Sequence, residues 1–277
     1  MKRKLFCEIS PLTYKISEMK CRGVRNISDV GHNFAKAKGA KLPEICYAHK
    51  SLIRRKLGNV DMTLQENKAV NLAIACSKID GILIRPGEEF SFWRLVGLPK
   101  EKDGYKRGLV ISRGKVEDGT GGGLCQLSNL IHWMVLHSPL EITEQHHHDA
   151  LDLFPDHDRK VPFGVGTSIM YNYIDYRFKN NTKNTFRLGV KVREEYLFGS
   201  LTCDRELRLK YDIVCENEHF TRESDGVYRN NEIYRNIIDV RTGNIIRREL
   251  IRKNHARIQY DEKYVPDRIV EYADNKL

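Results

Sequence analysis

The spacing of apolar side chains changes along the chain from a helical period to a strand period. Residues 62–79 carry apolar side chains three and four positions apart, which predicts a helix that ends before Gly81. A similar stripe predicts a second helix from Cys125 to His137, closed by Pro139. Alternating apolar and polar residues over 140–148, 167–180, 185–192 and 196–203 predict strands. Helices followed by many antiparallel-looking strands favour an α+β fold over a doubly wound parallel sheet.

The same pattern predicts the order of parts along the 277-residue chain. We expect a basic helical N-terminal segment over residues 1–50, made of helical and irregular pieces with breaks at Pro11, Gly23, Gly31, Gly39 and Pro43. A domain of helices packed on a mainly antiparallel sheet should cover 51–205, and a β-rich extension should cover 206–277. Turn residues at 224–226 and 242–244 divide that extension into strands.

Positive charge is concentrated at the start of the chain. The formal net charge is +10, and residues 1–60 contain 14 Lys and Arg but only 4 Asp and Glu. The remainder holds 33 of each kind and is therefore neutral. A basic N-terminus can touch an anionic surface. We expect no nucleic-acid partner, because neither zinc-finger spacing nor an aromatic RNA-binding motif is present.

The first residues, MKRKLFCEISPLTYKIS, begin with positive charge but contain no continuous apolar stretch of the kind found in signal peptides. No apolar run approaches the roughly 18 residues that a membrane-spanning helix needs. The seven cysteines lack the paired spacing of a disulfide framework. Together these features predict a cytoplasmic protein with reduced cysteines.

The stretch GTGGGLCQLSN, residues 119–129, places a glycine-rich loop directly before the predicted helix that begins at Cys125. A thiol at a helix N-terminus lies near free N–H groups, which lower its pKa from about 8.5. Glycines would let a substrate carbonyl approach, and their N–H groups could stabilise an oxyanion. The loop therefore predicts either a cysteine nucleophile, with Cys125 as the most acidic thiol, or an ordinary tight turn.

A cysteine nucleophile needs a base, and several histidines are candidates. His132 lies seven residues after Cys125, which places it roughly 10 Å along the helix and too far for a hydrogen bond. His137 is farther still. The HHHD run at 146–149 follows the next predicted strand, where His146 and His148 share one face. A metal site made by these two histidines and the following aspartate is an alternative, but no further ligand has recognisable spacing, so no cofactor is expected.

Three stretches resemble the VanW family: residues 66–97, 119–129 and 171–186. The resemblance runs from about residue 50 to about 205 and rests most specifically on the GGGLCQ run that contains Cys125. The family is tied to cell-wall and glycopeptide-resistance contexts. Some of its members look like cysteine-dependent L,D-transpeptidases that act on peptidoglycan stems.

The resemblance implies that Cys125 is the nucleophile and that His148 is its catalytic partner. Where family members often have Gly-x-Asp-Ala, this chain has Gly166 in place of the acid, so no third catalytic residue is implied. The expected partner is a peptidoglycan stem peptide or its precursor. The alternative is a non-enzymatic accessory protein of a resistance system. Candidate substrate-binding residues are Gly121, Gly122, Gly123, Gln126, Ser128 and Arg85.

Overall fold

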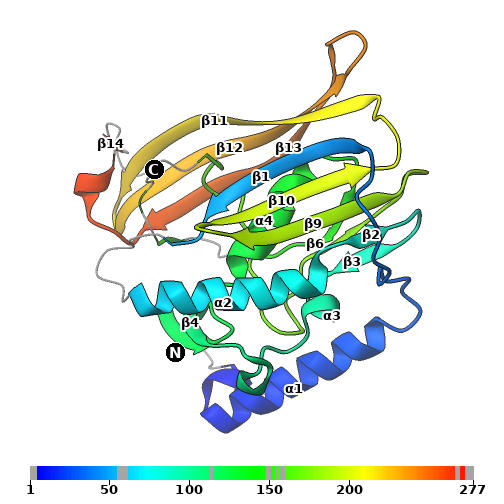
Figure 1. Cartoon of the computed structure of the whole chain (residues 1–277). Coiled ribbons are helices and arrows are strands. Elements are labelled where there is room, and N and C mark those ends of the chain that lie inside the picture. Colours follow the sequence, from blue (N-terminus) through cyan, green and yellow to red (C-terminus); the bar gives the residue numbers. More distant parts are fainter. Residues whose placement is uncertain are drawn as a thin grey trace.

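The computed structural model describes residues 5–54, 62–112, 115–147, 151–153, 155, 160–265 and 269–271. The fold is α+β, as predicted, and its sheets are mainly antiparallel (Figure 1). A doubly wound parallel arrangement is absent from these residues, because only two short edge pairings, β11 with β14 and β13 with β7, are parallel. The helices are α1 Pro11–Ser28, α2 Met62–Ile79, α3 Phe92–Val96 and α4 Cys125–Leu136.

A four-stranded antiparallel sheet forms one layer of the core, in the order β1-β10-β9-β2. Its strands are β1 Glu44–Leu52, β10 Tyr196–Cys203, β9 Phe186–Arg193 and β2 Ile82–Ile84. Helix α2 runs along this sheet (Figure 1). The side chains of α2 that point inward, such as Leu72 and Ile79, are fully buried in the largest apolar cluster.

Helix α4 lies between this sheet and a second, longer sheet. Leu130 and Met134 of α4 face Gly199 of β10, while Trp133 and Leu136 form a separate cluster with Ile233 of the second sheet. The second sheet has the order β14-β11-β12-β13-β7 and curls over the core (Figure 1). Its strands are β11 Leu209–Glu223, β12 Gly226–Asp239, β13 Ile245–Ile258, β7 Leu151–Asp152 and β14 Ile269–Glu271.

Two smaller sheets complete the fold. One has the order β3-β8-β6, with β3 Glu89–Ser91, β8 Arg177–Lys179 and β6 Glu141–Glu144. The other is the hairpin of β4 Arg107–Ser112 and β5 Lys115–Thr120, which leads into the glycine loop. Short 3-10 turns lie at Phe6–Glu8, Glu101–Asp103 and Glu262–Tyr264. No helix among the described residues is long and apolar enough to cross a membrane.

Several local predictions were wrong. Gly23 does not break a helix, because it lies inside α1, and Pro11 begins that helix rather than interrupting the chain. The segment expected to be helical up to residue 50 contains β1, which pairs with β10 about 150 residues later along the chain. Of the strand expected over 167–180, only β8 forms, because residues 171–173 make a turn.

Candidate functional site

The glycine loop before α4 is held by close backbone packing. Gly121 and Gly123 have positive φ angles of 79° and 90°, which disfavour any residue with a Cβ. A Cβ on Gly122 would lie 2.1 Å from the carbonyl carbon of Gly108 in β4. The side-chain amide of Asn71 donates a hydrogen bond of 2.9 Å to the carbonyl oxygen of Gly122. Packing and backbone angle therefore account for all three glycines.

Cys125 is the first residue of α4, as predicted, and it is half-buried. Burial raises the pKa of its thiol above the ordinary value. The backbone N–H groups of Ile169 and of Cys125 itself point toward the sulfur and oppose this rise, but they do not outweigh it. The prediction that Cys125 is an acidified thiol was therefore wrong, because desolvation outweighs the two backbone N–H groups.

The segment 166–169 covers the start of α4. The N–H of Thr167 donates a hydrogen bond of 2.7 Å to the side-chain oxygen of Asn129, one turn after Cys125. On the other side of the segment, the N–H of Ser168 donates to the carbonyl oxygen of His146 at 2.7 Å. This segment thus lies between the cysteine and the histidine run.

The hydroxyl groups of Thr167 and Ser168 are buried, and neither finds a hydrogen-bond partner among the described residues. Buried hydroxyls without partners are uncommon in native proteins. They leave unused donor and acceptor capacity in the segment that covers Cys125.

The predicted partner His148 lies outside the described residues, as does Asp149 of the alternative metal site. The structure therefore does not test the Cys125–His148 pair. Within the described part of the chain, no group of three or more His, Cys, Asp or Glu side chains is arranged to hold a metal ion. The imidazole of His146 instead lies 2.9 Å from a carboxylate oxygen of Glu144.

A partly buried polar chain that the sequence analysis missed runs beside this segment. The amide nitrogen of Gln145 lies 2.9 Å from Nε2 of His132 and 2.8 Å from Nε2 of His147. Because an amide nitrogen only donates, both ring nitrogens accept, and Nδ1–H of His132 donates to the Tyr176 hydroxyl at 3.1 Å. Burial, followed by the nearby His147, lowers the pKa of His132 to about 3. His132 is therefore neutral at physiological pH.

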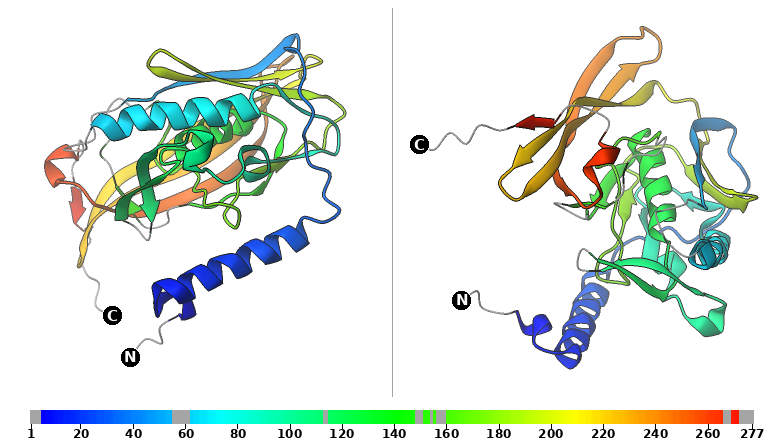
Figure 2. Two further views of the ribbon diagram at one scale, coloured as in Figure 1. Left: turned by 60° about the horizontal axis from the view of Figure 1, so that its bottom comes forward. Right: turned by 90° about the vertical axis from the view of Figure 1, so that its left-hand side faces the viewer.

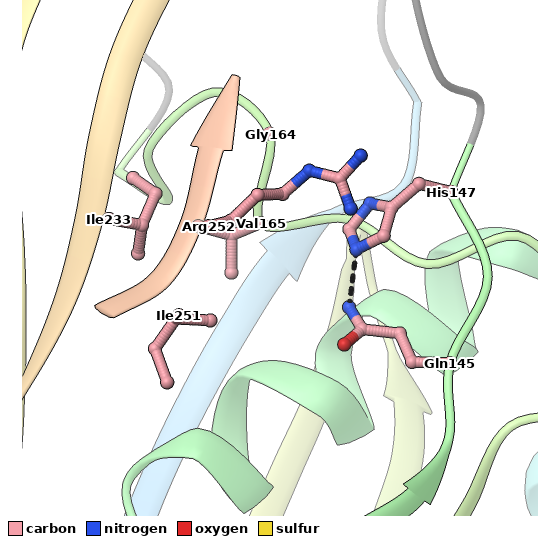
Figure 3. Close-up of a pocket in the computed structure, with 7 residues that line it drawn as sticks. All are labelled: Gln145, His147, Gly164, Val165, Ile233, Ile251 and Arg252. Atoms are coloured by element: carbon pink, nitrogen blue, oxygen red, sulfur yellow. Dashed lines mark hydrogen bonds between the residues drawn. The ribbon is translucent and has the colours of Figure 1, made fainter. Parts of the chain in front are cut away.

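A cavity of about 150 Å³ opens at the end of this chain, between the histidine run and strands β12 and β13 (Figure 3). The guanidinium of Arg252 and the imidazole of His147 reach toward each other across it (Figure 3). A fixed cation beside an imidazole suits a small anionic group such as a carboxylate. No sequence motif marks Arg252, which lies far along the chain in β13. The lining residues are Gln145, His147, Gly164, Val165, Ile233, Ile251 and Arg252.

Three other candidate residues use their polar groups within the fold. The Gln126 amide donates to the hydroxyl of Ser51 in β1 at 2.8 Å. The Ser128 hydroxyl donates to the carbonyl oxygen of Cys125 at 3.0 Å. Arg85 is half-exposed, and its nearest carboxylate is that of Glu88 in the same turn, at 3.8 Å. Among the described residues, no hydrogen bond or ion pair connects Arg85 with the glycine loop, and a substrate-binding role for these three residues stays a prediction.

Asp175 and Asn180, which lie in the third stretch that resembles the family, have structural roles. The buried carboxylate of Asp175 accepts hydrogen bonds from the Ser91 hydroxyl at 2.5 Å and from the backbone N–H of Trp93 at 3.1 Å. The Asn180 side chain accepts from the N–H of Thr182 and donates to two backbone carbonyls, which closes the turn before β9. Trp93 itself is a core residue.

Comparison with known proteins agrees with the motifs. Residues 67–202 match the family model described as VanW-like protein. The chain is 34% identical over 228 residues to the vancomycin B-type resistance protein VanW of Enterococcus faecalis, and the match covers 82% of each chain. It is 29% identical over 129 residues to the uncharacterized protein YoaR of Bacillus subtilis, covering 46% of this chain and 40% of that one. No solved structure matches significantly. The family-model match includes the glycine loop and Cys125 but ends before β12 and β13, which supply one wall of the cavity.

Proposed function

This chain belongs to the VanW family, and we propose that it acts in glycopeptide resistance, on the peptide stem of peptidoglycan or of its precursor. The proposal rests on the 34% identical relative, which is a vancomycin resistance protein and is matched over most of its length. A cytoplasmic location is part of the proposal, because the cysteines lack paired spacing. A cytoplasmic protein would meet the precursor rather than the finished wall.

The proposed chemistry is acyl transfer by Cys125. One observation carries it: the sulfur lies at the start of α4, where two backbone N–H groups point toward it. The thiolate would attack a stem-peptide carbonyl, forming an S–C bond while the C–N bond breaks and the leaving amine takes a proton. An acceptor amine or water would then attack the thioester, which releases the product and restores the thiol.

The raised pKa of Cys125 makes a proton acceptor necessary. At neutral pH the thiol holds its proton, so a base must remove it before the sulfur can attack. We propose His148 for this role. His132 is unsuitable, because its pKa is about 3 and both ring nitrogens are already hydrogen-bonded.

The cavity beside His147 extends this proposal to substrate recognition. Peptide stems carry carboxylates, and Arg252 supplies a cation for one of them. A volume of about 150 Å³ accommodates a small terminal group rather than a whole stem. The remainder of the stem would therefore lie outside the cavity.

The second candidate function is a non-enzymatic accessory role in resistance. Two observations favour it: packing and backbone angle account for the glycine loop, and burial raises the pKa of the Cys125 thiol. In this case the fold would bind its partner without forming a thioester.

The test compares Cys125→Ser with the wild type and with Cys21→Ser, which removes an exposed cysteine on α1. Each protein is incubated with tetrapeptide and pentapeptide stems, and its intact mass is measured after acid quenching. Acyl transfer predicts an adduct on the wild type and on Cys21→Ser. It also predicts loss of turnover in Cys125→Ser by at least about a thousandfold, since serine is a far weaker nucleophile without a stronger base.

Resistance is measured in parallel, in cells that depend on this protein. Full resistance in Cys125→Ser, together with no adduct on any variant, would refute acyl transfer and leave the accessory function. Loss of resistance in both cysteine variants would point to misfolding, which circular dichroism of the purified proteins would reveal.

A further inference from the structure

Helix α1 turns its apolar side away from the protein. None of its 18 residues is buried. Leu12, Ile16, Met19 and Ile27 recur at helical spacing along one side, which we call the outer face. Their exposed fractions are 68%, 47%, 69% and 75%. Both views in Figure 2 show α1 at the edge of the molecule, with the rest of the chain on one side of it only.

Polar contacts hold the opposite side of α1 against the protein. Arg25 makes two hydrogen bonds of 2.6 Å to the carboxylate of Glu144 in β6. Arg22 donates to the carbonyl oxygen of Tyr171 at 3.2 Å. Because these contacts set the rotation of the helix, the apolar stripe cannot turn inward without breaking them. The outer face is therefore a fixed surface that lacks a partner among the described residues.

The charges around the outer face are positive. At about 100° per residue, Lys15 and Lys20 border the stripe on its two sides. Neither lysine makes an ion pair with a described residue. Glu18, the acidic residue within α1, lies on the other side of the helix and pairs with Arg22 at 2.5 Å.

The residues that precede α1 are also apolar or positively charged. Leu5, Phe6 and Ile9 are exposed by 64%, 55% and 62%. The sequence before them supplies Lys2, Arg3 and Lys4. The N-terminal stretch thus combines exposed apolar side chains with a run of basic residues in the sequence.

We propose that the outer face of α1 docks on the surface of an anionic lipid bilayer. An apolar stripe bordered by lysines is the pattern of a helix that lies in the membrane interface, with its apolar side chains about 5–10 Å deep in the boundary between headgroups and acyl chains. The lysines would extend toward the anionic headgroups. The protein would then lie on the membrane without spanning it.

A second copy of this chain fits the same face less well. Two outer faces packed together would bury the apolar stripe, but they would also bring the lysines of both copies close together. An anionic bilayer would cover the apolar stripe with acyl chains and attract the lysines to its headgroups. This docking does not depend on the proposed acyl transfer, because the contacts of α1 described above reach Glu144 and Tyr171 and not Cys125.

The experiment measures flotation of the full chain with vesicles of phosphatidylcholine alone or mixed with phosphatidylglycerol. The wild type should float with the anionic vesicles, bind the neutral ones weakly, and be released as the salt concentration rises. Replacing Ile16→Glu together with Met19→Glu should lower the partition coefficient by at least about tenfold, because both side chains would have to enter the interface. Lys15→Gln with Lys20→Gln should remove most of the preference for anionic lipid.

A matched control carries Ile245→Glu and Ile246→Glu at the start of β13, where these side chains are 56% and 57% exposed. It makes the same chemical change away from α1 and should bind as the wild type does. The proposal is overturned if the wild type does not float, or if the outer-face variant floats as well as the control. It is also overturned if light scattering shows a wild-type dimer that the outer-face variant dissociates, since a second copy would then occupy this face.

Discussion

Helices α1 and α4 attach to the same protein in opposite ways. Nine of the twelve residues of α4 are buried, and apolar contacts with both main sheets hold it. None of the residues of α1 is buried, and ion pairs hold it at the edge. The comparison shows that an amphipathic pattern identifies the two sides of a helix but not which side faces the protein.

The difference arises from the surfaces that the two helices meet. Helix α4 meets apolar side chains, so burying its own apolar residues stabilises it. Helix α1 meets a cluster of buried charges, in which Arg177 forms a two-point ion pair with Asp29 at 2.6 and 2.9 Å. Asp29 directly follows α1, whereas Glu144 of β6 and Arg177 of β8 lie more than a hundred residues later in the sequence. The burial pattern of α1 thus depends on tertiary neighbours.

The largest effect is expected for Arg177→Leu. This change removes the closest cation from Asp29, leaving Arg94 at 3.3 Å, and also removes the arginine beside Asp175; both carboxylates are buried. Unpaired buried charge costs about 3–5 kcal/mol of unfolding free energy. Urea unfolding measures that loss, and hydrogen exchange should show α1 released from the protein.

The control for this change is Arg107→Leu, which removes one partner of the exposed Arg107–Asp118 pair. Because solvent screens that pair, its loss should change stability little. Equal effects of the two arginine changes, or an α1 that stays protected in Arg177→Leu, would contradict the role given to the buried ion pair.

A smaller loss is expected for Ile131→Ala in α4. Ile131 is fully buried in the main core, so the change leaves a cavity and should cost about 2–4 kcal/mol. The matched change Ile16→Ala, on the outer face of α1, should alter stability by no more than about 0.5 kcal/mol. Urea unfolding of both variants gives the comparison directly. A large loss in Ile16→Ala would mean that the outer face is covered in solution.

The two helices should also differ in how they respond to acid. The unfolded chain protonates His132 near its ordinary pKa of 6.5, whereas the folded chain does so only near 3. The unfolded state thus binds more protons in between, so stability is complete above pH 6.5 and falls by about 1.4 kcal/mol per pH unit below it. His132→Phe should be less stable at neutral pH but should lose this slope. A slope as steep as that of the wild type would refute the assignment to His132.

The contacts of α1 should persist to lower pH than the packing around α4. Burial opposes the ionisation of Asp29 and Glu144, but hydrogen bonds and charge from Arg177 and Arg25 outweigh it and lower both pKa values. Their contribution is present above the ordinary values of 3.8 and 4.5 and is lost as the pH falls through the lowered ones. Hydrogen exchange as a function of pH should show the region around α4 weakening before α1 is released.

Local patterns were sufficient to predict the elements whose apolar side chains recur at a regular period. The helical spacing over 62–79 matches α2, the start of α4 falls at Cys125, and the alternating stretches at 185–192 and 196–203 match β9 and β10. These segments pack through apolar side chains at a regular period, which the sequence displays directly.

Only part of the candidate site could be predicted from local sequence patterns. The glycine loop and the helix start at Cys125 follow from local sequence, because backbone angles and helix boundaries are local properties. The polar chain of His132, Gln145 and His147 could not be predicted, since its hydrogen bonds join a helix to the segment after a strand. Arg252 lines the cavity from β13, about a hundred residues after His147 in the sequence, and no sequence motif predicts its role.

The sequence alone established the α+β class, the position of Cys125 at a helix start, and the excess of positive charge near the N-terminus. Only the tertiary structure decided whether the pKa of Cys125 is raised or lowered, and which side of α1 faces away from the protein. The backbone N–H groups near the sulfur of Cys125 lower the pKa of its thiol, but the burial of that thiol in the folded protein raises it more. The period of α1 defines its two sides, whereas the charges of β6 and β8 determine which of them faces the solvent.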